Sequence, residues 1–335
     1  MRWYSITLTN STTGKLIVPN SLASLKTGAS YTSSDNAQVS GNPLIGAQNI
    51  NLDIPIAQLA LPAGNAWVQI EGISIPEIGQ ANDLNNANIV IKGGFQKGLP
   101  LANPAQAGVL VQGTIYQAFG NWIDTEQTVD LLIIPPIGTN DKPINLTLNW
   151  QKGQTLASAL HQTLSTAYPP PQYTIKINIS PNIVASETQP AYHGTLGQLA
   201  SYCYGVSKQI IKTANYQGVG LAIYGNTVIA DDGSSANTVK NIQFQELIGQ
   251  PTWLNPSTIQ FKCPMRADIN IFDQVKLPQA LVTTAVNTTS PLINANATFK
   301  GTYRIVNVRH VGNFRQASAD SWVTVFDAVT QPVPV

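Results

Sequence analysis

The 335-residue sequence has very few charged side chains. Asp, Glu, Lys and Arg together make up 10% of the residues, whereas soluble domains carry roughly 25%. The 18 Lys and Arg nearly balance the 17 Asp and Glu, so the net charge is +1. Specific binding to duplex nucleic acid needs clustered basic side chains, and this balance argues against it. The composition fits a chain packed against other subunits, or a neutral extracellular β-protein.

Histidine and cysteine are also scarce. The three histidines, His161, His193 and His310, form no HExxH motif and no i,i+4 pair, which excludes a zinc site encoded by local spacing. The two cysteines, Cys203 and Cys263, are too few for a disulfide framework. We expect each cysteine to be a small core residue, and we expect no metal and no cofactor.

Long apolar runs and a secretory leader are missing as well. The longest apolar run, at 131–137, is interrupted by two prolines and falls far short of the ~18 residues of a membrane helix. The first ten residues alternate like a strand and lack the continuous apolar core of a signal peptide. We therefore expect no membrane-spanning segment and a protein that stays in the compartment where it is made.

The sequence lacks recognisable catalytic motifs. It contains no Gly-x-Ser-x-Gly elbow and no GxxxxGK[ST] phosphate loop. A glycosidase needs two converging carboxylates, and the densest pairs are Asp124 with Glu126 and Asp231 with Asp232. The second pair is followed by Gly233, which is first of all a turn signature. The sequence therefore predicts a protein that is not an enzyme.

What the sequence does contain is β-strand patterning. Ile50, Leu52, Ile54 and Ile56 alternate with other residues, as do the apolar residues of 144–150 and 175–179. The pair Gly225-Asn226 between two apolar runs predicts a tight hairpin. With 25 Gly and 22 Pro among short strands, the pattern predicts a mainly β fold of barrels or sandwiches.

Two helices interrupt this pattern. Leu156, Leu160 and Leu164 recur every four residues and form one apolar stripe. This helix lies between the expected strands at 144–150 and 173–179, so the region predicts a small β-α-β module. A second helix is expected from Thr195, because Thr195 and Gln198 have capping-box spacing.

These elements divide the chain into three parts. Residues 1–140 are predicted to form a first β-barrel domain, with 15–47 as a loop or insert. Residues 141–192 would form the small α/β module, and residues 193–335 a second β-barrel domain.

Several segments, taken in order, resemble a known family. The first runs from 89 to 104 and on through 113–122, and the last covers 301–312 and 321–326. Between them, 247–253 leads into 259–263 and 272–278. From about residue 48 this order resembles the central baseplate hub proteins of contractile-tailed bacteriophages, the Mu-like hub family.

The resemblance implies two tail-tube-like β-barrels with an inserted β-α-β domain. It also implies a homotrimeric, pseudo-sixfold ring that joins the tail tube protein to the central spike protein and meets other baseplate proteins. DNA would pass through the lumen without specific binding, so we expect inward-facing positions to be neutral or acidic. The protein would be part of the virion tail baseplate and would assemble in the host bacterial cytoplasm.

The resemblance and the aromatic content suggest positions at a subunit interface. These are Phe95, Lys97, Leu99, Tyr116, Phe119 and Trp122. Two alternatives remain open at this point. Tyr116, Trp122 or Trp253 could form a sugar-binding platform, and the chain could be a cell-wall-cleaving tail component.

Overall fold

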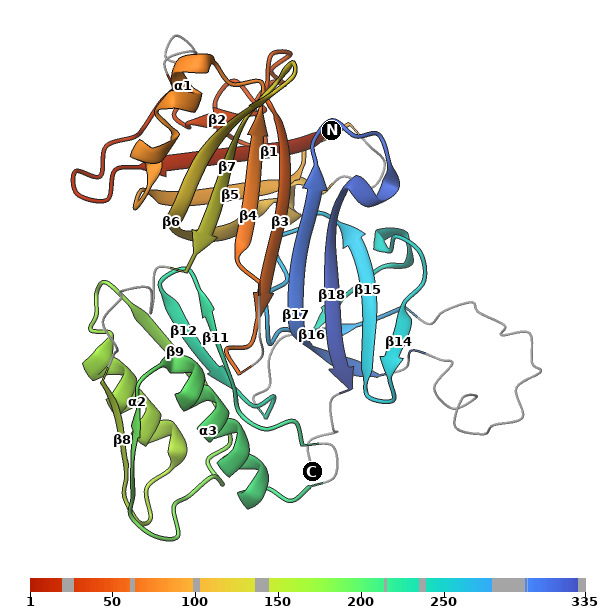
Figure 1. Cartoon of the computed structure of the whole chain (residues 1–335). Helices are drawn as coiled ribbons and strands as arrows, with labels where there is room; N and C mark the ends of the chain where they lie inside the picture. Colours follow the sequence, from red (N-terminus) through yellow and green to blue (C-terminus); the bar gives the residue numbers. More distant parts are fainter. Residues whose placement is uncertain are drawn as a thin grey trace.

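The computed structural model describes residues 1–19, 27–60, 64–98, 103–135, 145–213, 216–234, 239–278, 299 and 301–330. Most of the regular structure is β-strand, arranged as one large sheet with a smaller α/β unit beside it (Figure 1). None of the described helices is long and apolar enough to span a membrane. The expected mainly β fold with a small α/β module is confirmed.

The first lobe of the large sheet comes from the N-terminal part of the chain. Its strands are β1 (Arg2–Thr9), β2 (Tyr31–Thr32), β3 (Asn49–Ala57), β4 (Ala66–Glu71), β5 (Asn88–Phe95), β6 (Gly108–Ile123) and β7 (Glu126–Ile134). Its helical segments are α1 (Ile75–Gly79), η2 (Ala81–Leu84) and η3 (Pro104–Gln106). Apolar residues alternate along these strands as the sequence predicts, and one set forms the first hydrophobic core.

The second lobe comes from the C-terminal part. Its elements are β13 (Lys240–Asn241), η4 (Phe244–Glu246), β14 (Thr252–Asn255), β15 (Thr258–Pro264), β16 (Gln274–Lys276), β17 (Thr302–Asn313), η5 (Ala319–Ser321) and β18 (Trp322–Thr330). A separate hydrophobic core lies under these strands, and Phe261 and Phe326 stack at its centre with ring centroids 5.0 Å apart.

Strand β3 fuses the two lobes. It pairs with β4 on one side and with β17 on the other, so the strand order is β14-β15-β18-β17-β3-β4-β7-β6-β5-β1-β2. Figure 1 shows β17 lying beside β3, although β3 comes from the N-terminal part of the chain and β17 from the C-terminal part. Where two β-barrels were expected, the described strands of the two lobes form one continuous sheet, and no closed barrel is detected among them.

The α/β unit contains β8 (Leu146–Trp150), α2 (Leu156–Ala167), β9 (Thr174–Asn178), β10 (Gln189–His193), α3 (Leu196–Ile210), β11 (Gly220–Tyr224) and β12 (Thr227–Asp231). Both predicted helices are present, and the Thr195 hydroxyl caps α3 by accepting from the Gln198 amide. The β11–β12 hairpin turns at Gly225-Asn226 as expected, and Gly225 supplies the positive φ of 55°.

The pairing inside this unit is not apparent from the sequence. Strands β8 and β9 flank α2 along the chain as expected, but β8 pairs with β10 and β9 pairs with β12 in a different sheet. The α/β module was expected to cover residues 141–192. In the structure its hydrophobic core also includes residues up to Ala230, because α3 packs against β10 and β11 and the β11–β12 hairpin pairs with β9.

A buried ion pair ties the α/β unit to the second lobe. Asp231, at the end of β12, lies 2.8 Å from the guanidinium of Arg304 on β17, and both side chains are almost fully buried. The Arg304 guanidinium also stacks over the Phe272 ring at 4.4 Å. Burial raises the pKa of Asp231, and the charge of Arg304 opposes this change.

This pair yields a stability prediction. Replacing Arg304 with Met leaves a buried carboxylate without its partner, so we expect the free energy of unfolding to fall by about 3–5 kcal/mol in urea denaturation. The double variant D231L/R304M removes both charges and should recover part of this loss.

The control is Arg309→Met, which removes the partner of Asp53 in a more exposed pair. Such pairs contribute about 0–1 kcal/mol, so R309M should unfold almost like the wild type. Equal effects of R304M and R309M would contradict a special role for the buried pair.

Candidate functional site: the outer face of the large sheet

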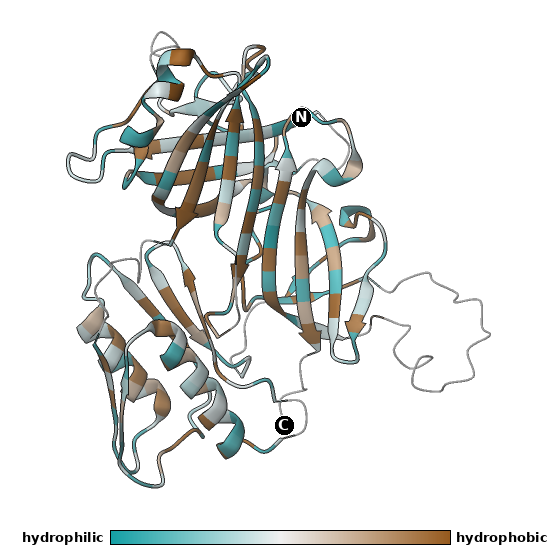
Figure 2. Ribbon diagram, in the orientation of Figure 1, coloured by the Kyte–Doolittle hydropathy of each residue, from teal (hydrophilic) through white to brown (hydrophobic). Residues whose placement is uncertain are grey.

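One face of the large sheet is turned away from the two hydrophobic cores, and we call it the outer face. Figure 2 shows hydrophobic and hydrophilic residues alternating along β4 and β17, which separates this face from the core face. The outer face crosses the boundary between the lobes without a break, because β3 and β17 are hydrogen-bonded neighbours. It is therefore a continuous surface to which both lobes contribute.

In the first lobe, polar side chains on this face bond to one another across strands. Asp130 of β7 accepts hydrogen bonds from Trp67 Nε1 at 3.0 Å, Gln69 Nε2 at 3.1 Å and Asn121 Nδ2 at 2.9 Å. These donors come from β4 and β6, on the two sides of β7. The Asp130 side chain is almost fully buried, and these bonds compensate the cost of burying a carboxylate.

Similar cross-strand hydrogen bonds between side chains occur on β3 and in the second lobe. Asn51 donates to Gln69 at 3.1 Å. In the second lobe, Asp327 of β18 accepts from Asn307 of β17 and from Gln260 of β15, both at 2.9 Å. Cross-strand pairs of this kind stabilise a sheet while leaving its surface polar.

The outer face carries few charges, and they nearly balance. By strand register its charged side chains are Asp53, Glu71, Glu126, Asp130, Asp327, Lys92, Lys262, Lys276 and Arg309. Arg309 forms a bidentate pair with Asp53 across the β3–β17 boundary, with 2.7 Å between Nε and Oδ1. Cations and carboxylates are interspersed in this set, so the face offers no basic patch for tight binding of a polyanion.

The predicted interface residues do not form one cluster. Phe119 is on the outer face opposite Asp130, and Trp122 lies at the end of the β6–β7 hairpin, 60% exposed beside the exposed Ile123. Tyr116 sits at a β-bulge in β6, away from the hairpin end. The sixteen-residue strand β6 therefore supplies three of the predicted side chains to different surroundings.

The remaining predicted residues lie near the end of β5. Phe95 is half-buried and packs against the first core, whereas Lys97 is exposed. Leu99 lies outside the described residues. Trp253, considered for sugar binding, stacks on Phe299 at 5.7 Å and is half-buried at the edge of the second core.

Candidate catalytic groups are dispersed or already bonded. His161 is exposed on α2, His193 is buried in β10, and His310 is buried in β17. Asp231 is paired with Arg304, while Asp232 accepts from the Ser180 amide and from the Tyr216 hydroxyl. Within the described part of the chain, no group of three or more His, Cys, Asp and Glu side chains could hold a metal ion.

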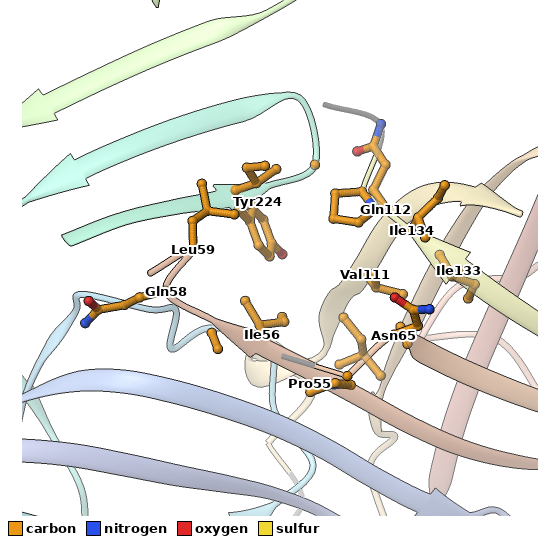
Figure 3. Close-up of a pocket in the computed structure, with 17 residues that line it drawn as sticks. Pro55, Ile56, Gln58, Leu59, Asn65, Val111, Gln112, Ile133, Ile134 and Tyr224 are labelled. Carbon is orange, nitrogen blue, oxygen red and sulfur yellow. The ribbon is translucent and has the colours of Figure 1, made fainter. Parts of the chain in front are cut away.

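A small apolar cavity lies where the first lobe meets the α/β unit. It measures about 290 Å³ and is lined by Ile56, Leu59, Val111, Ile134 and Tyr224 among others (Figure 3). The Tyr224 hydroxyl donates to the Val109 carbonyl at 2.8 Å and so links β11 to β6. With mainly aliphatic walls, the cavity offers little for catalysis.

His310 gives the pH prediction for this region. Complete burial lowers its pKa to about 3, and its Nδ1 lies 2.9 Å from the Thr324 hydroxyl. At pH values between about 3 and the ordinary histidine pKa of about 6.5, this histidine is protonated in the unfolded chain and neutral in the folded protein. The free energy of unfolding should therefore fall as the pH drops from 6.5 toward 3, with this residue adding up to ~1.4 kcal/mol per pH unit.

Denaturant melts of His310→Gln against pH test this expectation. The variant should show a flatter pH dependence than the wild type, whereas His161→Gln, which alters an exposed residue, should leave the slope unchanged. A wild-type slope in His310→Gln would show that His310 does not titrate as a buried group.

Comparison with known proteins bears on the fold. No protein-family model and no curated protein matches the sequence. Among solved structures, a prophage MuSo2 43 kDa tail protein from Shewanella oneidensis has a TM-score of 0.51 at 10% identity, covering 97% of this chain and 96% of its own. A tail protein from Neisseria meningitidis MC58 has a TM-score of 0.50 at 9% identity, covering 98% and 96%.

The chain shares the fold of these phage tail proteins. The similarity extends over nearly the whole length of both chains, so it includes the two lobes and the α/β unit. At such low identity the similarity concerns the fold alone.

Proposed function

We propose that the protein is a structural subunit of a phage tail or a related particle, acting as its baseplate hub. Three copies would form a ring that joins the tail tube to the central spike and encloses the DNA channel. The observation that carries this proposal is the outer face: one continuous, polar surface without a basic patch, shared by two lobes that have separate cores. The similarity to two tail proteins supports the same role.

The two lobes explain how a threefold ring could meet a sixfold tube. Each chain contributes two β-rich lobes joined through β3 and β17, so three chains would place six lobes around the channel. We place the outer face toward the channel. Its amides and carboxylates would keep water at the wall and repel phosphate groups, which lets DNA pass without being held.

The proposed role is mechanical and uses no acid, base or nucleophile. The tail tube, the spike and other baseplate proteins are the proposed partners, and the virion baseplate is the proposed location. A cell-wall-cleaving role would instead require two carboxylates that converge on a substrate. The Asp231 and Asp232 side chains are already bonded within the fold, which favours the structural role; zymography on peptidoglycan should show no clearing.

The oligomeric state tests the proposal. Light scattering behind a sizing column should give a mass near three times 35.9 kDa. Trp122 and Ile123 are 60% and 67% exposed at the end of the β6–β7 hairpin, and exposed aromatic side chains often anchor interfaces. We therefore expect Trp122→Ala to shift the trimer toward monomer, with about a tenfold rise in the concentration needed for assembly.

The matched control is Tyr192→Ala, which removes a similarly exposed aromatic side chain from β10 of the α/β unit. It should leave the mass unchanged. A wild-type chain that stays monomeric at micromolar concentration would argue against a ring that assembles by itself.

A further inference from the structure

A second, polar cleft separates the first lobe from the α/β unit. It measures about 610 Å³, within the ~300–1,000 Å³ range of small-molecule sites. One wall comes from β5, β6 and the segment before β5, and the other from the start of β9 and the β11–β12 turn. The side chains that carry the argument are Asn88, Gln112, Tyr116, Tyr173 and Asn226.

The chemistry of the cleft is polar but uncharged. No Asp, Glu, Lys or Arg is among the described residues that line it. Asn88 and Gln112 are exposed, and neither side-chain amide bonds to another described residue. A side-chain amide offers two donors and one acceptor, which suits adjacent hydroxyl groups. A charged ligand would find no counter-charge in the described walls.

Aromatic side chains complete the site. Tyr116 is the extra residue of a β-bulge between Ile115 and Gln117, and bulges commonly redirect a side chain. Its ring is 61% exposed in the cleft. On the opposite wall the Tyr173 ring is held edge-on by Tyr168, with centroids 5.5 Å apart. Two tyrosines that border these side-chain amides present flat apolar faces beside hydrogen-bonding groups.

One hydrogen bond joins the two walls: the Tyr224 hydroxyl donates to the Val109 carbonyl at 2.8 Å. Within the second wall, Asn226 donates to the Gln172 carbonyl at 3.2 Å and links the hairpin turn to the start of β9. Figure 3 shows Gln112 close to the end of the hairpin that carries Tyr224. A preformed site loses less entropy on binding than a mobile one.

We propose that this cleft binds a neutral saccharide. Tyr116 would stack against a sugar ring, and Asn88, Gln112 and Asn226 would bond to its hydroxyl or N-acetyl groups. The site goes beyond the proposed hub role, because it uses the junction with the α/β unit rather than the outer face. Neither role depends on the other.

Titration calorimetry of the full chain tests this site, using N,N′-diacetylchitobiose, maltotriose and the charged 3′-sialyllactose, alongside a neutral glycan array. We expect submillimolar binding of a neutral glycan and weaker binding of sialyllactose. Tyr116→Ala should weaken the binding at least about tenfold, and Gln112→Ala should also weaken it. Gln112→Ala should not change the mass of the trimer.

Tyr192→Ala is the matched control, because Tyr192 is 64% exposed outside the cleft, and it should bind like the wild type. Absence of binding to every neutral glycan would overturn the proposal, as would binding that Tyr116→Ala leaves intact. Neither result would affect the mass measurement that tests the hub role.

Discussion

The pairing of β3 with β17 is the contact on which the rest of the structure depends. It joins residues far apart in the sequence, such as Asp53 and Arg309, which are 256 positions apart, and it runs from Asn307 opposite Ala57 to Asn313 opposite Asn51. A hydrogen-bonded ladder resists bending far better than a linker. The two lobes, each with its own core, are therefore held as one sheet with a common outer face.

The scarcity of charged residues is reflected in the outer face of this sheet, which is polar mainly through uncharged side chains. Cross-strand bonds such as Asn51 to Gln69 and Asn307 to Asp327 keep the outer face polar without net positive charge. Where a carboxylate is buried, as at Asp130, amide and indole groups satisfy it in place of lysine or arginine. In the proposed ring, a wall built this way would stay wetted and would offer a polyanion no basic patch.

The strands and both helices could be predicted from the sequence because they depend on local patterns. Alternation at Ile50, Leu52 and Ile54 marks β3, and the cap at Thr195 marks the start of α3. The packing partners of these elements could not be predicted. An apolar stripe indicates that one face of a helix is buried, but it does not identify the element that covers this face. For this reason α3 was assigned to the second β-rich part, although it packs in the α/β core.

The site was less predictable than the fold. Asp231 belongs to an Asp-Asp-Gly sequence that is typical of a turn, and its ion-pair partner Arg304 is 73 residues away in the sequence. Likewise, the bulge that separates Tyr116 from Phe119 and Trp122 depends on the register between β6 and β7. The interface residues were chosen from the resembling segments and from aromatic character, and neither reveals which surface each side chain occupies.

The most direct test of the central claim is a cryo-electron microscopy map of the purified, assembled protein. The account predicts a ring of three chains in which six β-rich lobes surround a channel, with Asn51, Asp130 and Asp327 on the channel wall. A ring whose channel is lined by lysine and arginine, or one in which the outer face of the sheet points away from the axis, would contradict it.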